Sequence, residues 1–260
     1  MIAGYIAAVF IGVSLGLIGG GGSILTIPVL VYLFGLSPLQ ATGHSLFIVG
    51  ATSLAGAFAN YKRGNVHTVT AVYFSLSSTI TVFLARRYLL PAIPTEVVTI
   101  GNFVVTKSLF TMLLLAVVMM FAAIKMVSTK SEEDITHGLE SNITMIIISG
   151  IGVGLLTGLL GAGGGFLIIP ILVFQFRLPM KQAIGTSLLI ITINSLFGFL
   201  GDLVNEKVDW ELLLSVSALS ILGVYIGSRL GEKIQGEKLK RGFGWFVLVM
   251  GVYIVIRSLS

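Results

Sequence analysis

Long apolar segments with almost no charged residues dominate this sequence and restrict what it can fold into. The first 61 residues contain no Asp, Glu, Lys or Arg, and 10% of all 260 residues are charged. Ordinary soluble domains carry about 25% charged residues, whereas about 20 apolar residues are enough for a helix to cross a bilayer. The sequence therefore predicts an all-α polytopic membrane protein, because a helix satisfies its backbone hydrogen bonds within the segment.

Eight apolar segments are separated by short polar stretches, and one longer polar linker divides the chain. We expect residues 1–127 to form a first transmembrane repeat, residues 128–142 to form the linker, and residues 143–260 to form a second transmembrane repeat. The apolar segments are 2–34, 39–59, 66–85, 97–124, 143–176, 183–200, 212–230 and 243–256.

The two halves repeat one pattern with an offset of 142 residues. The stretch GLIGGGGSILTIP, which begins at Gly16, aligns with GLLGAGGGFLIIP, which begins at Gly158. Between Gly16 and Ile48, 18 of the 33 aligned pairs are identical. Internal duplication is common in secondary transporters, so the repeat favours a transport function.

Glycines interrupt the first apolar segment of each repeat near its centre. A helix over residues 2–34 would be about 50 Å long, which exceeds the hydrocarbon core of about 30 Å. Two shapes fit this segment. One is a tilted, unwound span, which gives eight spans in total. The other is a re-entrant hairpin that turns at Gly19–Gly22 and leaves three full spans per repeat, so that the second repeat is inverted relative to the first.

Basic residues in the loops distinguish the two shapes, because they prefer the cytoplasmic side of a membrane. The hairpin arrangement collects 11 basic residues on one face and 4 on the other, whereas eight spans give 9 and 6. The inverted arrangement is therefore favoured. It predicts a multi-pass protein of the cell (inner) membrane with a cytoplasmic linker and both termini outside the cytoplasm.

The glycine breaks point to an anion-binding site in the centre of the protein. A broken helix exposes backbone N–H groups, which is tolerated at membrane depth only where they are buried in protein or line a cavity, and a helix N-terminus attracts anions. We expect new half-helices to begin near Ser23 and Gly165 and to converge. The expected ligands are the backbone groups of Gly20, Gly21, Gly22, Ser23, Gly163, Gly164 and Gly165.

Close helix packing is the alternative role for glycines in apolar segments. We assign Gly12, Gly150 and Gly154 to packing because they lie four residues from further glycines. At such a position we expect Gly12→Ala to have a mild effect.

A polar cluster begins the second apolar segment of each repeat, with the sequences QATGHSL and QAIGTSL. His44 and Ser45 align with Thr186 and Ser187, and all four are candidate ligands that complete the coordination of an anion. Hydrogen bonding between helices is the alternative for these side chains.

Lys107 is an ionisable residue well inside an apolar segment. Charges within a membrane are costly and are functional candidates by default, with snorkelling toward an interface as the alternative. Lys107 is therefore a candidate substrate-binding cation.

The sequence offers little for catalysis or for a cofactor. The chain has no cysteine, which excludes disulfides and thiolate metal sites, and its three histidines lie in different segments without metal-ligand spacing. We expect no metal, no cofactor and no enzyme activity. The net charge of +5 reflects orientation in the membrane and does not indicate nucleic-acid binding.

The paired stretches GLIGGGGSILTIPVL and GLLGAGGGFLIIPIL, followed by QATGHS and QAIGTS, resemble the TauE/SafE family of membrane permeases. The resemblance covers nearly the whole chain, including the later VDW at Val208–Trp210. It implies the export or import of small sulfur-containing anions, such as sulfite and organosulfonates. Thiosulfate transporters that resemble this group use cysteines, so that mode is not expected here.

These observations predict a transporter of a small anion, sulfite or an organosulfonate, that works by alternating access at a central site between the repeats. An anion channel is the alternative within transport, and a membrane-embedded enzyme or a scaffold is the alternative from another class. The expected partners are the small anionic substrate and the lipid bilayer. A homodimer is left open.

Overall fold

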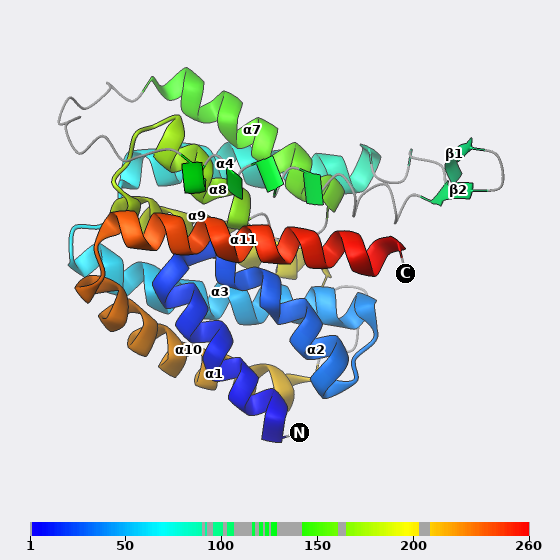
Figure 1. The fold of residues 1–260 in the computed structure, drawn as a ribbon, viewed down its shortest axis with the longest axis horizontal. Helices are drawn as coiled ribbons and strands as arrows, with labels where there is room; N and C mark the ends of the chain where they lie inside the picture. Colours follow the sequence, from blue (N-terminus) through cyan, green and yellow to red (C-terminus); the bar gives the residue numbers. More distant parts are fainter. Residues whose placement is uncertain are drawn as a thin grey trace.

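A computed structural model gives the fold, a bundle of helices in stacked layers (Figure 1). It describes residues 2–89, 92, 96–100, 103–106, 116–117, 120–121, 123–124, 126–128, 142–160, 165–202 and 209–259. The elements are α1 (Ile2–Ile18), the 3₁₀ helix η1 (Gly19–Leu25), α2 (Thr26–Phe34), α3 (Pro38–Lys62), α4 (Thr68–Leu84), the π-helical turn η2 (Ala85–Leu89), β1 (Glu96–Ile100), β2 (Phe103–Thr106), α7 (Ile143–Leu160), α8 (Gly165–Phe174), α9 (Met180–Asp202), α10 (Trp210–Lys233) and α11 (Gly236–Leu259).

The helices have the surface of a membrane protein, as predicted. Large apolar side chains such as Phe10, Leu76 and Leu222 are more than half exposed, which a soluble protein avoids over so many positions. Among the described residues, three helices are long and apolar enough to cross a membrane: Thr68–Leu89, Met180–Leu200 and Trp210–Lys233. The fold class is therefore helical and membrane-embedded.

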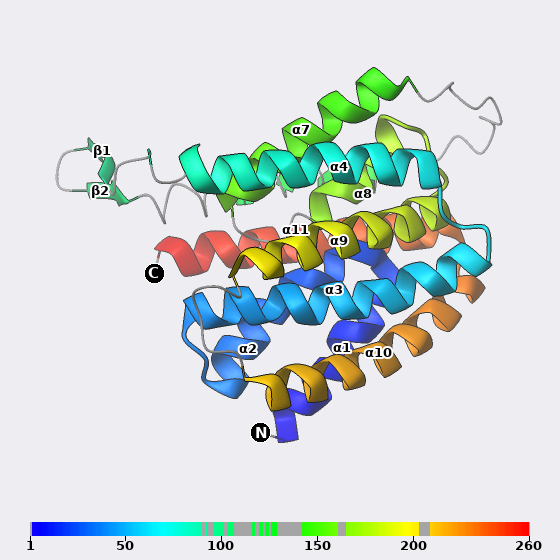
Figure 2. The ribbon, with the colours of Figure 1, turned by 180° about the vertical axis from the view of Figure 1, so that it is seen from behind.

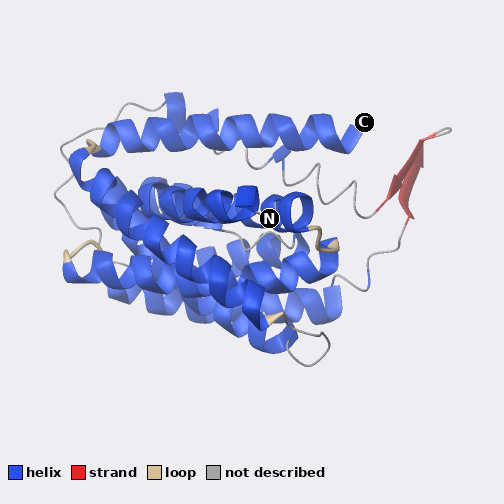
Figure 3. Ribbon diagram, turned by 90° about the horizontal axis from the view of Figure 1, so that it is seen from below, coloured by secondary structure: helices blue, strands red, loops and turns tan. Residues whose placement is uncertain are grey.

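A short β-hairpin departs from the all-α prediction. Strands β1 and β2 pair antiparallel, with Glu96 opposite Thr106 and Ile100 opposite Phe103, where we expected the apolar segment 97–124 to begin a span. The run EVVTI and the run FVVT are rich in Val, Thr, Ile and Phe, which favour strands over helices. The hairpin stands apart from the helices (Figure 3).

Side chains at the helix starts explain where three of the helices begin. Ser37 and Gln40 form a capping box at the start of α3, with Pro38 as its first residue, an arrangement that satisfies free backbone N–H groups. His67 accepts a hydrogen bond from the backbone N–H of Thr70 at the start of α4. Asp209 does the same for Leu212 at the start of α10.

The first helix of each half packs along the third helix of the other half. Gly12 of α1 lies against the Ser220 backbone of α10, and Gly154 of α7 lies against the Ser78 backbone of α4. Gly12 and Gly154 are equivalent by the 142-residue offset, and so are Ser78 and Ser220. The packing of first helix on third helix is therefore reciprocal between the two halves. Figure 2 shows α1 beside α10 and α7 beside α4.

The packing role assigned to Gly12, Gly150 and Gly154 is confirmed, because each closely approaches a neighbouring helix. The expectation that Gly12→Ala is mild is wrong. A Cβ at Gly12 would overlap the Ser220 carbonyl group, and backbone atoms cannot move aside as the end of a flexible side chain does.

The middle helices of the two halves, α3 and α9, run antiparallel to each other. A Cβ at Gly50 would lie 2.8 Å from Leu196, one at Gly56 would lie 3.0 Å from Leu188, and one at Gly198 would lie 3.3 Å from Leu46. Later positions in α3 thus meet earlier positions in α9. The helices α3 and α9, which are equivalent by sequence, therefore run in opposite directions.

Helix α2 returns alongside α1 after the glycine run. The rings of Tyr5 and Phe34 meet edge to face with centroids 5.4 Å apart, although Tyr5 begins α1 and Phe34 ends α2. At the turn itself, a Cβ on Gly22 would lie 2.5 Å from the Leu15 backbone nitrogen. The chain therefore reverses direction between Ile18 and Thr26.

Polar contacts join the end of α3, the start of α9 and the end of α10. The Arg63 guanidinium forms an ion pair with the Glu232 carboxylate, and the Lys181 ammonium donates to the Glu232 carbonyl oxygen at 2.9 Å. These three helix ends therefore lie at one end of the bundle.

Two glycines in α7 test whether glycine is needed where helices pack closely. A Cβ at Gly154 would lie 2.6 Å from the Ser78 carbonyl oxygen, whereas one at Gly152 meets nothing within 4 Å. Gly154→Ala should lower the free energy of unfolding by about 1–3 kcal/mol through overpacking. Gly152→Ala should leave it unchanged or raise it by up to about 1 kcal/mol through helix propensity. Thermal unfolding in detergent measures both, and equal effects would contradict the packing arrangement.

Candidate functional site

Gly20 of η1 and Gly165, the first residue of α8, meet at the interface between the halves. A Cβ at Gly20 would lie 2.5 Å from the Gly165 carbonyl oxygen, and one at Gly165 would lie 2.5 Å from the Gly20 carbonyl oxygen. The Ile191 side chain covers both positions. The backbones of Gly20 and Gly165 thus lie close together, and this contact leaves no room for a side chain on either residue.

In the first half, the run after α1 forms a 3₁₀ helix, η1, and α2 begins at Thr26. The prediction that a half-helix begins near Ser23 is wrong by three residues. The Ser23 hydroxyl donates to the Gly20 carbonyl oxygen at 2.7 Å, so Ser23 closes the tight turn instead of capping α2. Gly21 lies within this turn, and Gly22 lies against α1.

In the second half, α8 extends from Gly165 to Phe174. Gly163 and Gly164 lie outside the described residues, as does Lys107. Their assignment to the site stays a prediction.

Helix α9 supplies the side chains nearest the first glycine break. Gly19 has a φ of 66°, a left-handed conformation that glycine adopts without strain, and a Cβ added there would lie 2.8 Å from the Ser187 hydroxyl oxygen. Ser187 is fully buried and donates to the Ile184 carbonyl oxygen at 2.8 Å. Its equivalent, Ser45, is also buried. Ser187 is therefore the predicted side chain that the structure brings to the glycine break.

His44 and Thr186 lie at the helix starts, each bonded to the opposite half. The Thr186 hydroxyl accepts a hydrogen bond from the backbone N–H of His67 at 3.0 Å, and His44 Nε2 accepts one from the backbone N–H of Asp209 at 3.4 Å. His67 and Asp209 are the residues before α4 and α10, and they are equivalent by the 142-residue offset. The structure thus uses His44 and Thr186 to hold the two halves together.

The imidazole of His44 has both nitrogens engaged. Nδ1 lies 2.9 Å from the Gln40 carbonyl oxygen, which is an acceptor only, while Nε2 accepts from the Asp209 N–H. A ring that donates from Nδ1 and accepts at Nε2 satisfies both contacts. In this arrangement His44 acts as a structural bridge.

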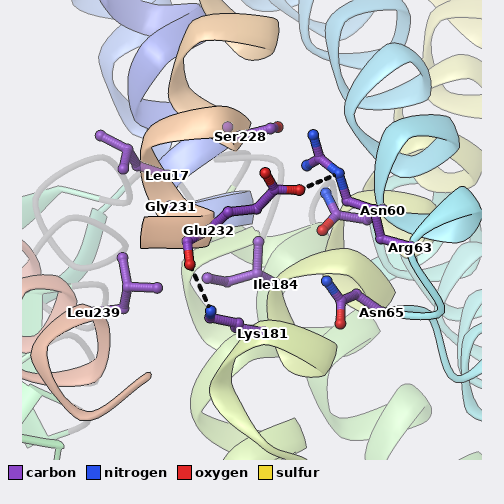
Figure 4. Close-up of a pocket in the computed structure, with 11 residues that line it drawn as sticks. Leu17, Asn60, Arg63, Asn65, Lys181, Ile184, Ser228, Gly231, Glu232 and Leu239 are labelled. Carbon is purple, nitrogen blue, oxygen red and sulfur yellow. Dashed lines mark hydrogen bonds and ion pairs between the residues drawn. The ribbon is translucent and has the colours of Figure 1, made fainter. Parts of the chain in front are cut away.

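A pocket at the end of the bundle contains charged residues that the sequence analysis did not single out (Figure 4). Its lining includes Asn60 and Arg63 of α3, Lys181 of α9 and Glu232 of α10. The basic loop residues indicate the orientation of the chain in the membrane. Arg63 and Glu232, however, are 169 positions apart. No local pattern predicts that they form a pair.

A second cluster of polar side chains joins α4 and α9. The Asn194 side-chain amide donates to the Ser78 hydroxyl at 3.0 Å, and its carbonyl oxygen also accepts from Thr79. Asn194 lies in an apolar helix, so its position in the sequence marks it as notable but does not reveal its partners. Within the described part of the chain, no group of three or more His, Cys, Asp or Glu residues is arranged to hold a metal ion.

Comparisons with known proteins agree with the sequence motifs. Residues 5–254 match the family model described as sulfite exporter TauE/SafE. The chain belongs to the TauE/SafE family. It is 31% identical over 254 residues to a probable membrane transporter protein of Xylella fastidiosa, covering 95% of this chain and 92% of that protein. It is 27% identical over 230 residues to the probable membrane transporter protein YdhB of Bacillus subtilis, covering 88% and 90% of the two chains.

The chain is also 25% identical over 270 residues to a probable membrane transporter protein of Methanocaldococcus jannaschii, covering 98% of this chain and 94% of that protein. No solved structure matches the chain. This TauE/SafE protein is therefore a membrane transporter by family, and the expected family resemblance is confirmed.

Thr186 provides a test of the contacts that bridge the halves. Thr186→Val removes the acceptor for the His67 N–H and should lower the free energy of unfolding by about 1 kcal/mol. Thr192→Val is the control, because the Thr192 hydroxyl donates to the Leu188 carbonyl oxygen within its own helix. Chemical unfolding in detergent compares the two. Thr186→Ser should retain wild-type stability, and a loss as large as that of the valine variant would contradict the bridge.

Proposed function

We propose that this TauE/SafE protein carries a small anion, sulfite or an organosulfonate, across the cell membrane by alternating access about the two glycine breaks. The description of the matching family as sulfite exporter supports the class of substrate. The names of the relatives, which are probable membrane transporter proteins, support transport as such.

The observation that carries this proposal is the contact between Gly20 and Gly165. It brings two interruptions of helical structure, one from each half, to a single region of an apolar bundle. Backbone N–H groups near helix starts favour anions, and glycine allows a ligand to approach the backbone closely. Gly20, Gly21 and Gly22 with Gly163, Gly164 and Gly165 are the proposed backbone ligands.

Buried hydroxyl groups make the interior polar enough for such a ligand. Thr26, Thr52 and Ser53 are fully buried, and their hydroxyl groups have no hydrogen-bond partner within the described part of the protein. Unpaired buried polar groups are costly, so a polar ligand or water is a natural partner. Ser45 and Ser187 are the proposed side-chain ligands, and Lys107 is the proposed substrate-attracting cation.

We propose that the repeats are inverted in the membrane. The antiparallel packing of α3 against α9 supports this, because equivalent helices that span a membrane in opposite directions belong to inverted repeats. The contacts of Arg63 and Lys181 with Glu232 also support it. Eight simple spans would put the residue 63 loop on the opposite side of the membrane from the loops at 181 and 232.

The segment formed by α1, η1 and α2 is then a re-entrant hairpin. The meeting of Tyr5 with Phe34 supports this shape, because it returns the chain to the side from which α1 began. The face that collects Arg63, Lys181 and the other basic loop residues is cytoplasmic by the charge rule. Both termini are then outside the cytoplasm.

Uptake into proteoliposomes tests the proposed function. The purified protein should transport sulfite or a small organosulfonate, and a neutral sulfone of similar size should neither be transported nor compete, since it gains little from helix dipoles. Transport should saturate and should show counterflow of labelled substrate. A steady anion conductance without counterflow would instead indicate a channel.

Substitutions at the glycine contact test its location. Gly20→Ala and Gly165→Ala should each lower transport at least about ten-fold, equivalent to about 1.4 kcal/mol, because the added methyl group forces the two breaks apart. Gly242→Ala is the control, since a Cβ there meets nothing within 4 Å. If either variant folds well and transports normally, the substrate site does not lie at the contact between Gly20 and Gly165.

Two exposed positions test the inversion. Ser37 precedes α3 and Gln235 lies between α10 and α11, and the chain has no native cysteine. Membrane-impermeant thiol reagents should label Ser37→Cys from outside the cell and Gln235→Cys from the cytoplasm. Labelling of both positions from the same side would support eight spans with parallel repeats.

A further inference from the structure

The pocket at the basic end of the bundle joins three charged groups from three helices. Arg63 at the end of α3 pairs with the carboxylate of Glu232 near the end of α10. Lys181 at the start of α9 donates to the Glu232 carbonyl oxygen at 2.9 Å. Figure 4 shows the Glu232 side chain directed toward Arg63 from the opposite wall. Two cations, one from each half, thus contact Glu232: Arg63 contacts its carboxylate, and Lys181 contacts its backbone carbonyl.

The ion pair between Arg63 and Glu232 can be broken at a small cost in free energy. The Arg63 side chain is 28% exposed and the Glu232 side chain is 48% exposed. Ion pairs that water reaches contribute little to stability, so the carboxylate can leave the guanidinium at small cost. An anion that arrives from solution can therefore compete with Glu232 for Arg63.

The inner wall of this pocket leads toward the glycine breaks. Gly16 and Leu17 line the pocket and belong to the last turn of α1 before Gly19. Ile184 also lines it, and the Ile184 Cα lies 3.3 Å from the position of a Cβ on Gly19. An anion held at Arg63 would therefore be separated from the first break by about one turn of helix.

We propose that Arg63 and Lys181 form an anion-binding access subsite for the transported substrate, and that the Glu232 carboxylate occupies this subsite until an oxyanion displaces it. The inference rests on the proposed function. The ligand class is a small oxyanion with at least two oxygens on one centre, such as sulfite or a sulfonate. Such a group matches the fork of a guanidinium as a carboxylate does.

The subsite belongs to one side of the membrane only. By the 142-residue offset, Arg63 corresponds to Asn205, Lys181 to Leu39 and Glu232 to Leu90. The opposite half therefore lacks the same charged set at equivalent positions. Changes at these residues should alter the affinity for anion presented from the basic face and leave the other face unaffected, a sidedness that a purely structural role does not produce.

The test is sulfite uptake into vesicles of both orientations, with the apparent KM measured for each face. Glu232→Gln removes the competing carboxylate and should lower KM at the basic face by about three- to ten-fold, while Arg63→Gln and Lys181→Gln should raise it by a similar factor. Arg63→Lys should fall between wild type and Arg63→Gln, because it keeps the charge and loses the fork. The double variant Arg63→Gln/Glu232→Gln should not show the lower KM expected for Glu232→Gln alone.

Glu237→Gln is the matched control, because Glu237 pairs with Arg241 one helical turn away within α11 and not across the pocket. It should leave KM unchanged on both faces. A rise of KM in Glu232→Gln, or equal changes on both faces, would overturn the subsite and assign the ion pair to stability. If wild type transports sulfite and no variant changes KM, the subsite is wrong and the proposed function stands. If the wild-type protein transports no anion, both the subsite and the proposed function are wrong.

Discussion

Direct backbone contact between Gly20 and Gly165 is the constraint on which the rest of the arrangement depends. Two chain segments can approach this closely only where neither carries a side chain, and the Ile191 side chain fills the space beside both. The contact joins η1 of the first half to the start of α8 in the second half. It gives a reason for glycine at these two positions, although glycine costs roughly 1 kcal/mol in helix propensity.

The exchange of first helices between the halves follows from the same geometry. Together with this contact, α1 packs on α10 and α7 packs on α4, where Gly12 and Gly154 allow close backbone approach. The helix starts are then held by reciprocal hydrogen bonds, in which the backbone N–H of Asp209 donates to His44 and the backbone N–H of His67 donates to Thr186. His44 and Thr186 occupy equivalent positions, and each accepts a hydrogen bond from the opposite half. The two halves therefore share the hydrogen bond at this position but not the residue type.

Much of this architecture could be predicted from the sequence, because duplication and apolar pattern act over long stretches. The membrane class and the family were both predictable. The start of α2 at Thr26 was not predictable. The Ser23 hydroxyl donates to the Gly20 carbonyl oxygen within the 3₁₀ helix, and this hydrogen bond competes with a capping role for Ser23. The β1–β2 hairpin was missed because its residues are as apolar as those of a membrane span.

The contacts between the halves lay beyond sequence reasoning for a different reason. A repeat tells which residues are equivalent, and it does not tell which residues are adjacent. His44 and Thr186 were predicted as anion ligands, yet their neighbours are helix starts in the opposite half. The pairing of Arg63 with Glu232 depends on the ends of α3 and α10 lying together, and the tertiary fold alone brings them there.

The central claim is that a small oxyanion binds beside the two glycine breaks. Crystals grown with selenite, a heavier analogue of sulfite, test it most directly through the anomalous scattering of selenium. The account predicts a peak within about 3 Å of backbone N–H groups in the region of Gly19–Gly22 and Gly163–Gly165, close to Ser187. A selenium peak found only outside this region, with the breaks still packed against each other, would contradict it.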